Sequence, residues 1–238
     1  MRARMRIDER VTVATIMMTA LFGSPADAAA PPIRAQIDLL ELRSGPGGAH
    51  LALESTFSAG SNLHQFAVKV DGGSDSRVAF DCLQFQGLWM PQVAAGTALA
   101  LGVRHDQGAA GELSYAVAGV ETELTPWLAG EDYFYLSRHG DLTGGAKLVV
   151  RWPLGDRLVL EPRIQFGWSE GSVPSQRLAR GLTDAQASFR LRHPIGKNAE
   201  FYIGLIHKRL IGGTYSLARA AGEPAVSTRA VTGFGLSF

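Results

Sequence analysis

The sequence has a single cysteine, Cys82, among its 238 residues, and no excess of charge of either sign. One cysteine excludes an internal disulfide. Lysine and arginine together number 23 against 22 aspartates and glutamates, so no electrostatic feature favours nucleic acid as a partner. Beyond residue 28 no run of about 18 consecutive apolar residues occurs, which excludes a helix that spans a membrane.

Residues 1–28 have the pattern of a secretory signal peptide. Four arginines precede the apolar run 11–23, and Ser-Pro-Ala-Asp-Ala follows with a small-residue cleavage site after Ala28. Cleavage there removes four arginines and three acids, so the exported chain is expected to be neutral, with 19 basic and 19 acidic residues. It also removes every methionine except Met90.

From Ala35 onward the sequence shows no amphipathic helix of useful length. It shows short segments in which apolar and polar residues alternate, separated by Gly, Pro, Asn and Asp, which is the pattern of strands and turns. The fold class is therefore predicted to be all-β. The twelve expected strands cover residues 36–43, 50–58, 63–71, 77–89, 95–105, 113–124, 128–137, 144–152, 157–168, 183–193, 199–210 and 228–238.

The expected connections are of two kinds. Those after even-numbered strands are tight, such as "AGSN" and "TPW", whereas those after odd-numbered strands are longer, up to "IGGTYSLARAAGEPAVS". Short turns at one end and longer loops at the other are typical of an antiparallel up-and-down outer-membrane barrel, with short turns in the periplasm. We therefore expect a short periplasmic lead over residues 29–35, then a barrel over 36–238 in outer-membrane lipid. A soluble β-sandwich is the alternative.

Several strands alternate so that one face is apolar and the other carries charge. In 158–168, leucine, isoleucine, phenylalanine and tryptophan side chains oppose Glu161, Arg163 and Gln165. A barrel places the apolar face toward lipid and the polar face toward its interior. The charges expected inside, either paired with one another or selecting permeant solutes, are Glu54, Lys69, Arg104, Asp132, Glu161, Arg163, Arg190 and Lys208.

The last strand carries its own pattern. Phe234, Leu236 and Phe238 share one phase, opposite small residues. This alternation predicts that the strand closes the barrel. An alternating strand with an aromatic carboxyl terminus also resembles the signal that barrel-assembly machinery reads, which makes that machinery an expected partner.

Four stretches resemble the copper-resistance protein B family of outer-membrane proteins. They are "LLELRSGPGGAHLALESTFSAGSNLHQFAVKVDGG" (39–73), "ALGVRHD" (100–106), "RLVLEPRIQ" (157–165) and "KRLIGGTYSLARAAGEPAVSTRAVTGFGLSF" (208–238). They occur in order over nearly the whole exported chain. The resemblance implies a role in copper homeostasis, alongside a periplasmic multicopper oxidase.

Fuller members of that family carry an amino-terminal extension rich in methionine, histidine and aspartate. Here only residues 29–35 precede the first expected strand, so the chain is interpreted as a barrel-only member. Thioether and imidazole groups suit Cu(I). Copper is the one ion that the resemblance implies, and no cofactor is required.

Histidines near the outer rim are the candidate metal ligands within the barrel itself. The set is His50, His105, Asp106, His139 and Asp141. None of these residues has the close spacing of H-x-H or H-x-x-x-H, so the interpretation as solvated loop residues is favoured over a metal site.

Three other functions stay open. A general small-solute pore and a structural or adhesive barrel need no metal. The third is a lipid hydrolase, which is an enzyme and needs a serine, a histidine and an orienting asparagine or acid on the lipid face. Because Asn62 and Asn198 are both expected at the inner turns, we predict that the protein is not an enzyme.

Overall fold

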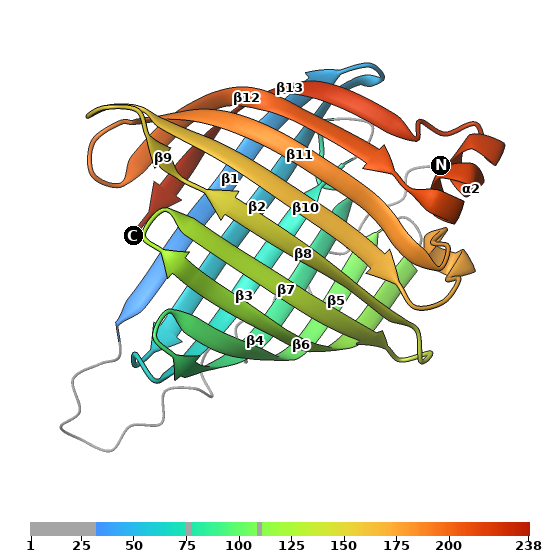
Figure 1. Ribbon diagram of the computed structural model, residues 1–238, viewed down its shortest axis with the longest axis horizontal. Coiled ribbons are helices and arrows are strands. Elements are labelled where there is room, and N and C mark those ends of the chain that lie inside the picture. Colours follow the sequence, from blue (N-terminus) through green and yellow to red (C-terminus); the bar gives the residue numbers. More distant parts are fainter. Residues whose placement is uncertain (1–31, 75–77, 109–110) are drawn as a thin grey trace, which may run out of the picture. The chain divides into compact units, whose positions relative to one another are not determined.

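Antiparallel strands, each paired with its neighbours along the chain, close into a cylinder (Figure 1). The computed structural model describes residues 32–74, 78–108 and 111–238, so the predicted signal peptide lies outside the described residues. Strand β1 (Ile33–Gly45) pairs with β13 (Val226–Ser237), which completes the wall. The intervening strands of the wall are β2 (Gly48–Gly60), β3 (His64–Gly73), β4 (Cys82–Ala94), β5 (Thr97–Gly108), β6 (Gly111–Thr125), β7 (Leu128–Ser137), β8 (Leu142–Val150), β10 (Val159–Ser169), β11 (Gly181–Pro194) and β12 (Ala199–Leu210).

The predicted all-β barrel of twelve strands is confirmed, with one addition. A two-residue strand, β9 (Trp152–Pro153), pairs with the start of β10 beyond the end of β8. The expectation that no helix occurs is wrong for one loop, because α2 (Gly212–Ala220) forms between β12 and β13. No helix within the described residues is long and apolar enough to span a membrane.

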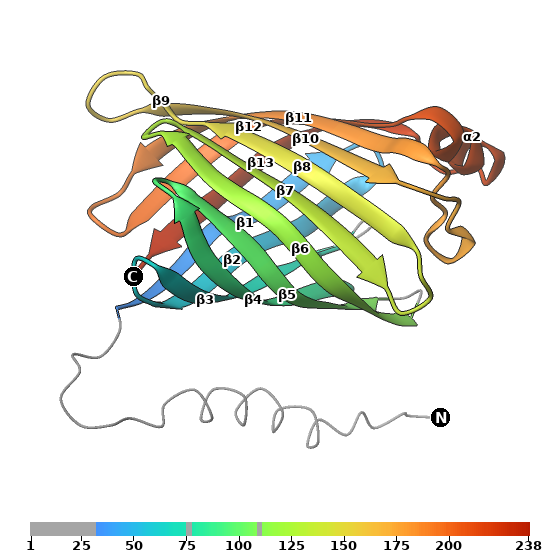
Figure 2. The same ribbon diagram turned by 60° about the horizontal axis from the view of Figure 1, so that its bottom comes forward.

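The two ends of the barrel differ in their connections (Figure 2). We call the end that holds the carboxyl terminus the short-turn end, and the end that holds α2 the long-loop end. The longest connections, 170–180 and 211–225, lie at the long-loop end. There β1 and β2 extend further than expected, and the connection between them is reduced to residues 46–47. Gly47 and Gly48 form this turn with φ of 90° and 107°, which glycine adopts without strain.

Strand β1 contains a bulge near its middle. Ile37 lies opposite Ser55 and Leu39 lies opposite Glu54, so Asp38 has no partner across the ladder. A bulge inserts one extra residue and shifts the alternation of faces. As a result, Leu39 is fully buried and the adjacent Asp38 reaches the interior arginines.

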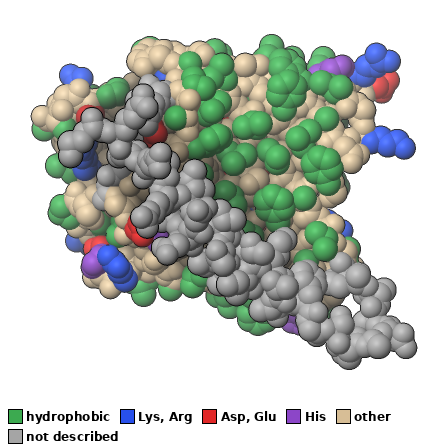
Figure 3. All heavy atoms as spheres, turned by 180° about the vertical axis from the view of Figure 1, so that it is seen from behind, with side chains coloured by type: hydrophobic (Ala, Val, Ile, Leu, Met, Phe, Trp, Pro, Cys, Tyr) green, Lys and Arg blue, Asp and Glu red, His purple; other side chains and the backbone are tan. Residues whose placement is uncertain are grey.

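Elsewhere the strands alternate as a barrel in lipid requires. Val103, Phe189 and Leu205 expose 61%, 56% and 56% of their surfaces on the outer face. Figure 3 shows hydrophobic side chains spread over the strands on one side of the barrel. Exposed tryptophans lie in or near the short turns, as expected for an interfacial belt. These are Trp89, Trp127 and Trp152.

Candidate functional site

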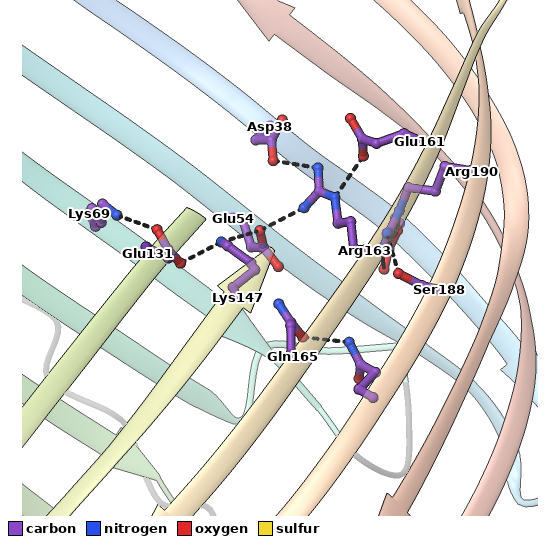
Figure 4. Close-up of polar contacts among 12 residues, drawn as sticks. Asp38, Glu54, Lys69, Glu131, Lys147, Glu161, Arg163, Gln165, Ser188 and Arg190 are labelled. Atoms are coloured by element: carbon purple, nitrogen blue, oxygen red, sulfur yellow. Dashed lines mark hydrogen bonds and ion pairs between the residues drawn. The ribbon is translucent and has the colours of Figure 1, made fainter. Parts of the chain in front are cut away.

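A continuous series of ion pairs crosses the interior of the barrel (Figure 4). We call it the cross-barrel chain. Its side chains alternate in sign, and they come from eight of the strands that make up the wall. In order, the chain consists of Glu121, Lys69, Glu131, Lys147, Glu54, Arg163, Glu161, Arg192 and Glu200.

The lysine half of this chain joins β3 to β6, β7 and β8. Lys69 Nζ lies 3.1 Å from Glu131 Oε2 and also contacts Glu121. The Tyr133 hydroxyl donates a hydrogen bond to Glu121. Lys147 Nζ lies 2.7 Å from Glu131 Oε1, so Glu131 is shared by both lysines.

The centre of the chain joins opposite walls. Lys147 Nζ on β8 lies 3.6 Å from Glu54 Oε2 on β2. Five strands separate β2 from β8 in either direction around the wall, so the two strands are diametrically opposed. Arg163 Nη1 on β10 lies 3.2 Å from the same carboxylate oxygen. Glu54 therefore connects the lysine half to the arginine half.

The centre of the arginine half, formed by Arg163, Glu161 and Arg192, is almost completely excluded from solvent. Arg163 binds Glu161 and Asp38, each at 2.6 Å, and Arg192 Nε lies 2.9 Å from Glu161 Oε2. Arg192 also contacts Glu200. The Arg163 and Arg192 side chains expose 2% and 1% of their surfaces, and Glu161 exposes none. Charges buried to this extent require partners, and each of these has at least two.

A second group of buried charges lies beside the arginine half. Arg190 Nη2 lies 3.0 Å from Glu41 Oε2, and Arg43 Nε lies 2.6 Å from Glu41 Oε1. Arg190 also donates a hydrogen bond of 2.9 Å to Ser188 Oγ. The guanidinium groups of Arg190 and Arg192 lie over the ring of Tyr202. This group ties β1 to β11 and β12.

The interior wall formed by β3 to β7 also carries an apolar cluster, beside the lysine half and the Arg104–Asp106 pair. Its buried side chains pack as a cluster of Ala67, Leu88, Met90, Ala100, Val117 and Tyr133. Between this cluster and the short turns lies a cavity of about 300 Å³. Met90, Glu121, Glu131 and Lys147 are among the residues that line it. The cavity therefore ends against the lysine half of the cross-barrel chain.

Six of the eight charges expected inside the barrel make interior ion pairs. They are Glu54, Lys69, Arg104, Glu161, Arg163 and Arg190. Lys208 is in phase with the interior residue Ile206 but is exposed near the long-loop end of β12. The prediction for Asp132 is wrong, because it is in phase with the exposed Phe134 and Leu136 on the outer face. Its neighbour Glu131 points inward.

The sequence-based prediction missed several members of this network. Asp38 was hidden by the bulge, which breaks the alternation around it. Lys147 and Glu131 carried a signal, since each is in phase with polar or small residues of its strand. Arg192 lies two residues after Arg190, and the same alternation directs both side chains inward. The interior charges that were missed include Asp38, Glu41, Arg43, Asp71, Glu121, Glu131, Lys147 and Glu200.

The five candidate metal ligands are not brought together. His50 is buried on the inner face of β2, whereas His105 lies on the outer face of β5 with its Nδ1 2.9 Å from Ser114 Oγ.

The two candidate acids are occupied by other partners. Asp106 accepts two hydrogen bonds from Arg104, at 2.6 and 2.7 Å. His139 and Asp141 lie in the turn after β7, where His139 contacts Arg138 and Asp141 accepts a hydrogen bond from Ser137.

Across the described ranges, 32–74, 78–108 and 111–238, no three histidine, cysteine, aspartate or glutamate side chains form a group able to hold a metal ion. Met90 is buried in the apolar cluster, with no histidine in that cluster. The described interior therefore contains carboxylates already bound to lysine and arginine, and no assembled copper site.

At the carboxyl terminus, Phe234 and Leu236 lie on the outer face of β13. Phe238 follows directly after this strand and is 70% exposed. The backbone of Phe238 exchanges two hydrogen bonds with Ala35. These residues therefore lie at the closing seam. Their role in recognition by assembly machinery stays a prediction.

The two long connections pack on each other at the long-loop end. Ala179 donates a backbone hydrogen bond of 3.0 Å to Thr214 Oγ1 of α2. Arg177 and Glu223 form an ion pair between the same two connections. Val173 of the first connection and Ala218 of the second are buried. These contacts give the long-loop end an ordered surface.

The structure is that of an outer-membrane β-barrel, and comparison with solved structures agrees. The barrel superimposes on the NanC porin with a TM-score of 0.54 at 10% identity, covering 86% of this chain and 98% of that one. A KdgM porin in complex with disordered oligogalacturonate gives 0.51 at 12% identity, covering 87% and 98%. At these identities the likeness shows the fold alone.

The family is shown by sequence. A family profile described as "Copper resistance protein B precursor (CopB)" matches residues 33–238, the whole barrel, so the chain belongs to this family. Copper resistance protein B of Escherichia coli is 29% identical over 154 residues, and a homolog from Pseudomonas syringae pv. tomato is 22% identical over 201. The matched regions cover 63% and 84% of this chain, but 51% and 68% of those relatives, so the chain spans about half the length of the first.

Proposed function

We propose that this barrel supports copper resistance at the outer membrane by binding copper ions or by letting them pass, without catalysing a reaction. The observation that carries the proposal is the extent of the family match, which covers the whole barrel from residue 33 to residue 238. Both relatives are named for copper resistance. Family and fold neighbours are those of a non-enzymatic barrel.

Copper is the cargo of the barrel in this proposal and not a resident cofactor. The entry point that the interior offers is the cavity at the short-turn end, where Met90 supplies a thioether and Glu121 and Glu131 supply carboxylates. Thioethers favour Cu(I), and carboxylates bind Cu(II) less selectively. Since short turns face the periplasm in barrels of this kind, a periplasmic multicopper oxidase is the partner placed to exchange copper with this end.

Copper tolerance of a strain that lacks the protein is the test. We expect the strain to stop growing at lower copper concentrations than its parent, and the wild-type gene to restore tolerance. Tolerance of zinc is the control, because general weakening of the envelope lowers both. Unchanged copper tolerance, or an equal loss for zinc, contradicts the proposal.

Binding is measured separately from tolerance. Purified barrel is titrated with Cu(I) and with Cu(II), and the titration is repeated with Met90→Leu, which conserves volume in the apolar cluster. Cu(I) binding that is lost in Met90→Leu supports a thioether ligand. Absence of binding in the wild type leaves passage of copper as the remaining form of the proposal.

One observation favours the enzyme alternative. His105 and Ser114 form a histidine–serine pair on the lipid face, two members of a hydrolytic triad. The third member is not supplied by asparagine, because Asn62 and Asn198 are both in short turns, whereas His105 lies in the long-loop half of β5. His207 and Thr228 make the same kind of cross-strand contact elsewhere. Phospholipid hydrolysis in detergent that Ser114→Ala abolishes is the result that selects the hydrolase.

A further inference from the structure

We infer that the barrel is not an open diffusion pore: the cross-barrel chain closes it, and solutes pass only when Lys147 separates from Glu54 and Glu131. The inference goes beyond the proposed function, because it concerns the state of the interior and holds whether or not copper is the cargo. The porins that share the fold do not determine this property, since likeness at this level shows the fold alone.

The first argument is that the chain spans the interior. Its contacts run from β6 through β3, β7 and β8 to β2, and then through β10 and β11 to β12. The step between Lys147 and Glu54 joins strands that face each other across the full width (Figure 4). In a channel, charges on opposite walls stay apart with water between them. Here Lys147 Nζ and Glu54 Oε2 are 3.6 Å apart, which leaves no room for a water molecule between them.

The second argument is dehydration. Charged groups that line a water-filled passage remain accessible to that water. Counted over whole residues, Glu161 and Arg192 expose 0% of their surfaces, and Arg190 and Arg163 expose 1% and 3%. The centre of the arginine half is therefore packed like a protein core. A solute that crosses the barrel is expected to pass through the lysine half, where the charged side chains are more exposed.

The third argument comes from the remaining cross-section. The apolar cluster on β3 to β7 occupies part of the interior away from Arg163, Arg190 and Arg192, with Leu88 and Tyr133 each 3% exposed. The cavity of about 300 Å³ starts at the short turns and ends at Glu121, Glu131 and Lys147. This space has the form of a vestibule in front of a closed barrier.

The contact between Lys147 and Glu54 is the part of the barrier best suited to open. At 3.6 Å it is longer than the contacts of 2.6 to 3.2 Å that Arg163 makes with its acids. The Lys147 and Glu54 side chains are 21% and 23% exposed, whereas the Arg163 side chain is 2% exposed. Water therefore already reaches this contact, so separating it costs less than separating the buried arginine pairs.

Ion conductance of the full-length exported protein in a planar lipid bilayer, in potassium chloride, tests the inference. We expect the wild type to insert and to pass little current. The double variant Glu54→Ala with Lys147→Ala removes the side chains that meet at the centre without changing net charge. It is expected to raise conductance on the order of tenfold, because a polar constriction has been removed.

The matched control is Arg104→Ala with Asp106→Ala. This pair has the same charges and lies inside the barrel, but both residues belong to β5, so their 2.6 Å contact does not cross the interior. The control is expected to conduct like the wild type. Folding of every variant is checked by the heat-dependent shift in gel mobility that closed barrels show.

Three results overturn the inference. One is a wild type that already conducts as an open pore, which is decisive even if no variant folds. The second is a folded double variant that conducts no more than the wild type. The third is an equal increase in the control. Because the current is carried by potassium and chloride, none of these results depends on whether the protein confers copper tolerance.

Discussion

The two sides of the barrel interior are filled by opposite kinds of side chain. On β3 to β7 the buried residues form an apolar cluster that includes Ala67, Leu88 and Val117. On β10 to β12 and β1 they are charged, such as Glu161, Arg190 and Arg192. Both of these groups of side chains are buried. An apolar side needs only matching shape, whereas a charged side needs every partner in place, so single changes should damage the two sides differently.

The largest expected effect is on the charged side. Glu161→Ala leaves Arg163 and Arg192 buried next to each other without the more buried of the two carboxylates that they share, the other being Asp38. We expect the free energy of unfolding to fall by about 3–5 kcal/mol, the cost of leaving buried charge uncompensated. Urea unfolding of the barrel in lipid vesicles measures this loss. A loss below about 1 kcal/mol would mean that water replaces the carboxylate and that the charged side is not dry.

The corresponding change on the apolar side is Leu88→Ala. Leu88 is 3% exposed within the cluster. Its replacement by alanine leaves a cavity, but it leaves no charged group without a partner. We expect a loss of about 2–4 kcal/mol, as for other buried leucines. The same urea experiment measures it. A loss greater than that of Glu161→Ala would reverse the order and show that the charged side tolerates damage better than the apolar one.

A smaller loss of stability is expected where a substitution changes only the packing of the interior and no charge. Gly233 faces the interior on β13, and an added Cβ would lie 2.6 Å from Tyr202 Oη and 2.5 Å from the Leu40 carbonyl oxygen. We expect Gly233→Ala to cost about 1–3 kcal/mol through overpacking. The control is Gly87→Ala on the outer face of β4, where a Cβ meets nothing within 4 Å and a change within about 0.5 kcal/mol is expected. Equal losses would contradict the assignment of faces.

The comparison also shows what the sequence was able to predict. Alternation with period two is local, so it identified the strands, their faces and six interior charges. The cross-barrel contacts are not local: Glu54 and Lys147 come from strands that are far apart in the chain and opposite in space. The bulge at Asp38 altered the phase without any glycine to mark it. Two adjacent acids, Glu131 and Asp132, left the phase of β7 ambiguous, and the prediction chose the wrong one.

Substitutions at these two acids have the smallest expected effect on stability, and they test directly which face of β7 points into the barrel. Asp132 lies on the outer face, in a hollow lined by Val120, Leu148 and Ile164. A carboxylate facing lipid is unfavourable, so Asp132→Leu should raise the free energy of unfolding by about 1 kcal/mol. Glu131→Leu should lower it, because Lys69 and Lys147 both lose a partner. Unfolding in vesicles measures both variants. A gain for Asp132→Leu and a loss for Glu131→Leu follow only if β7 turns Glu131 inward. The reverse pair of signs would return Asp132 to the interior and break the chain between Lys69 and Lys147.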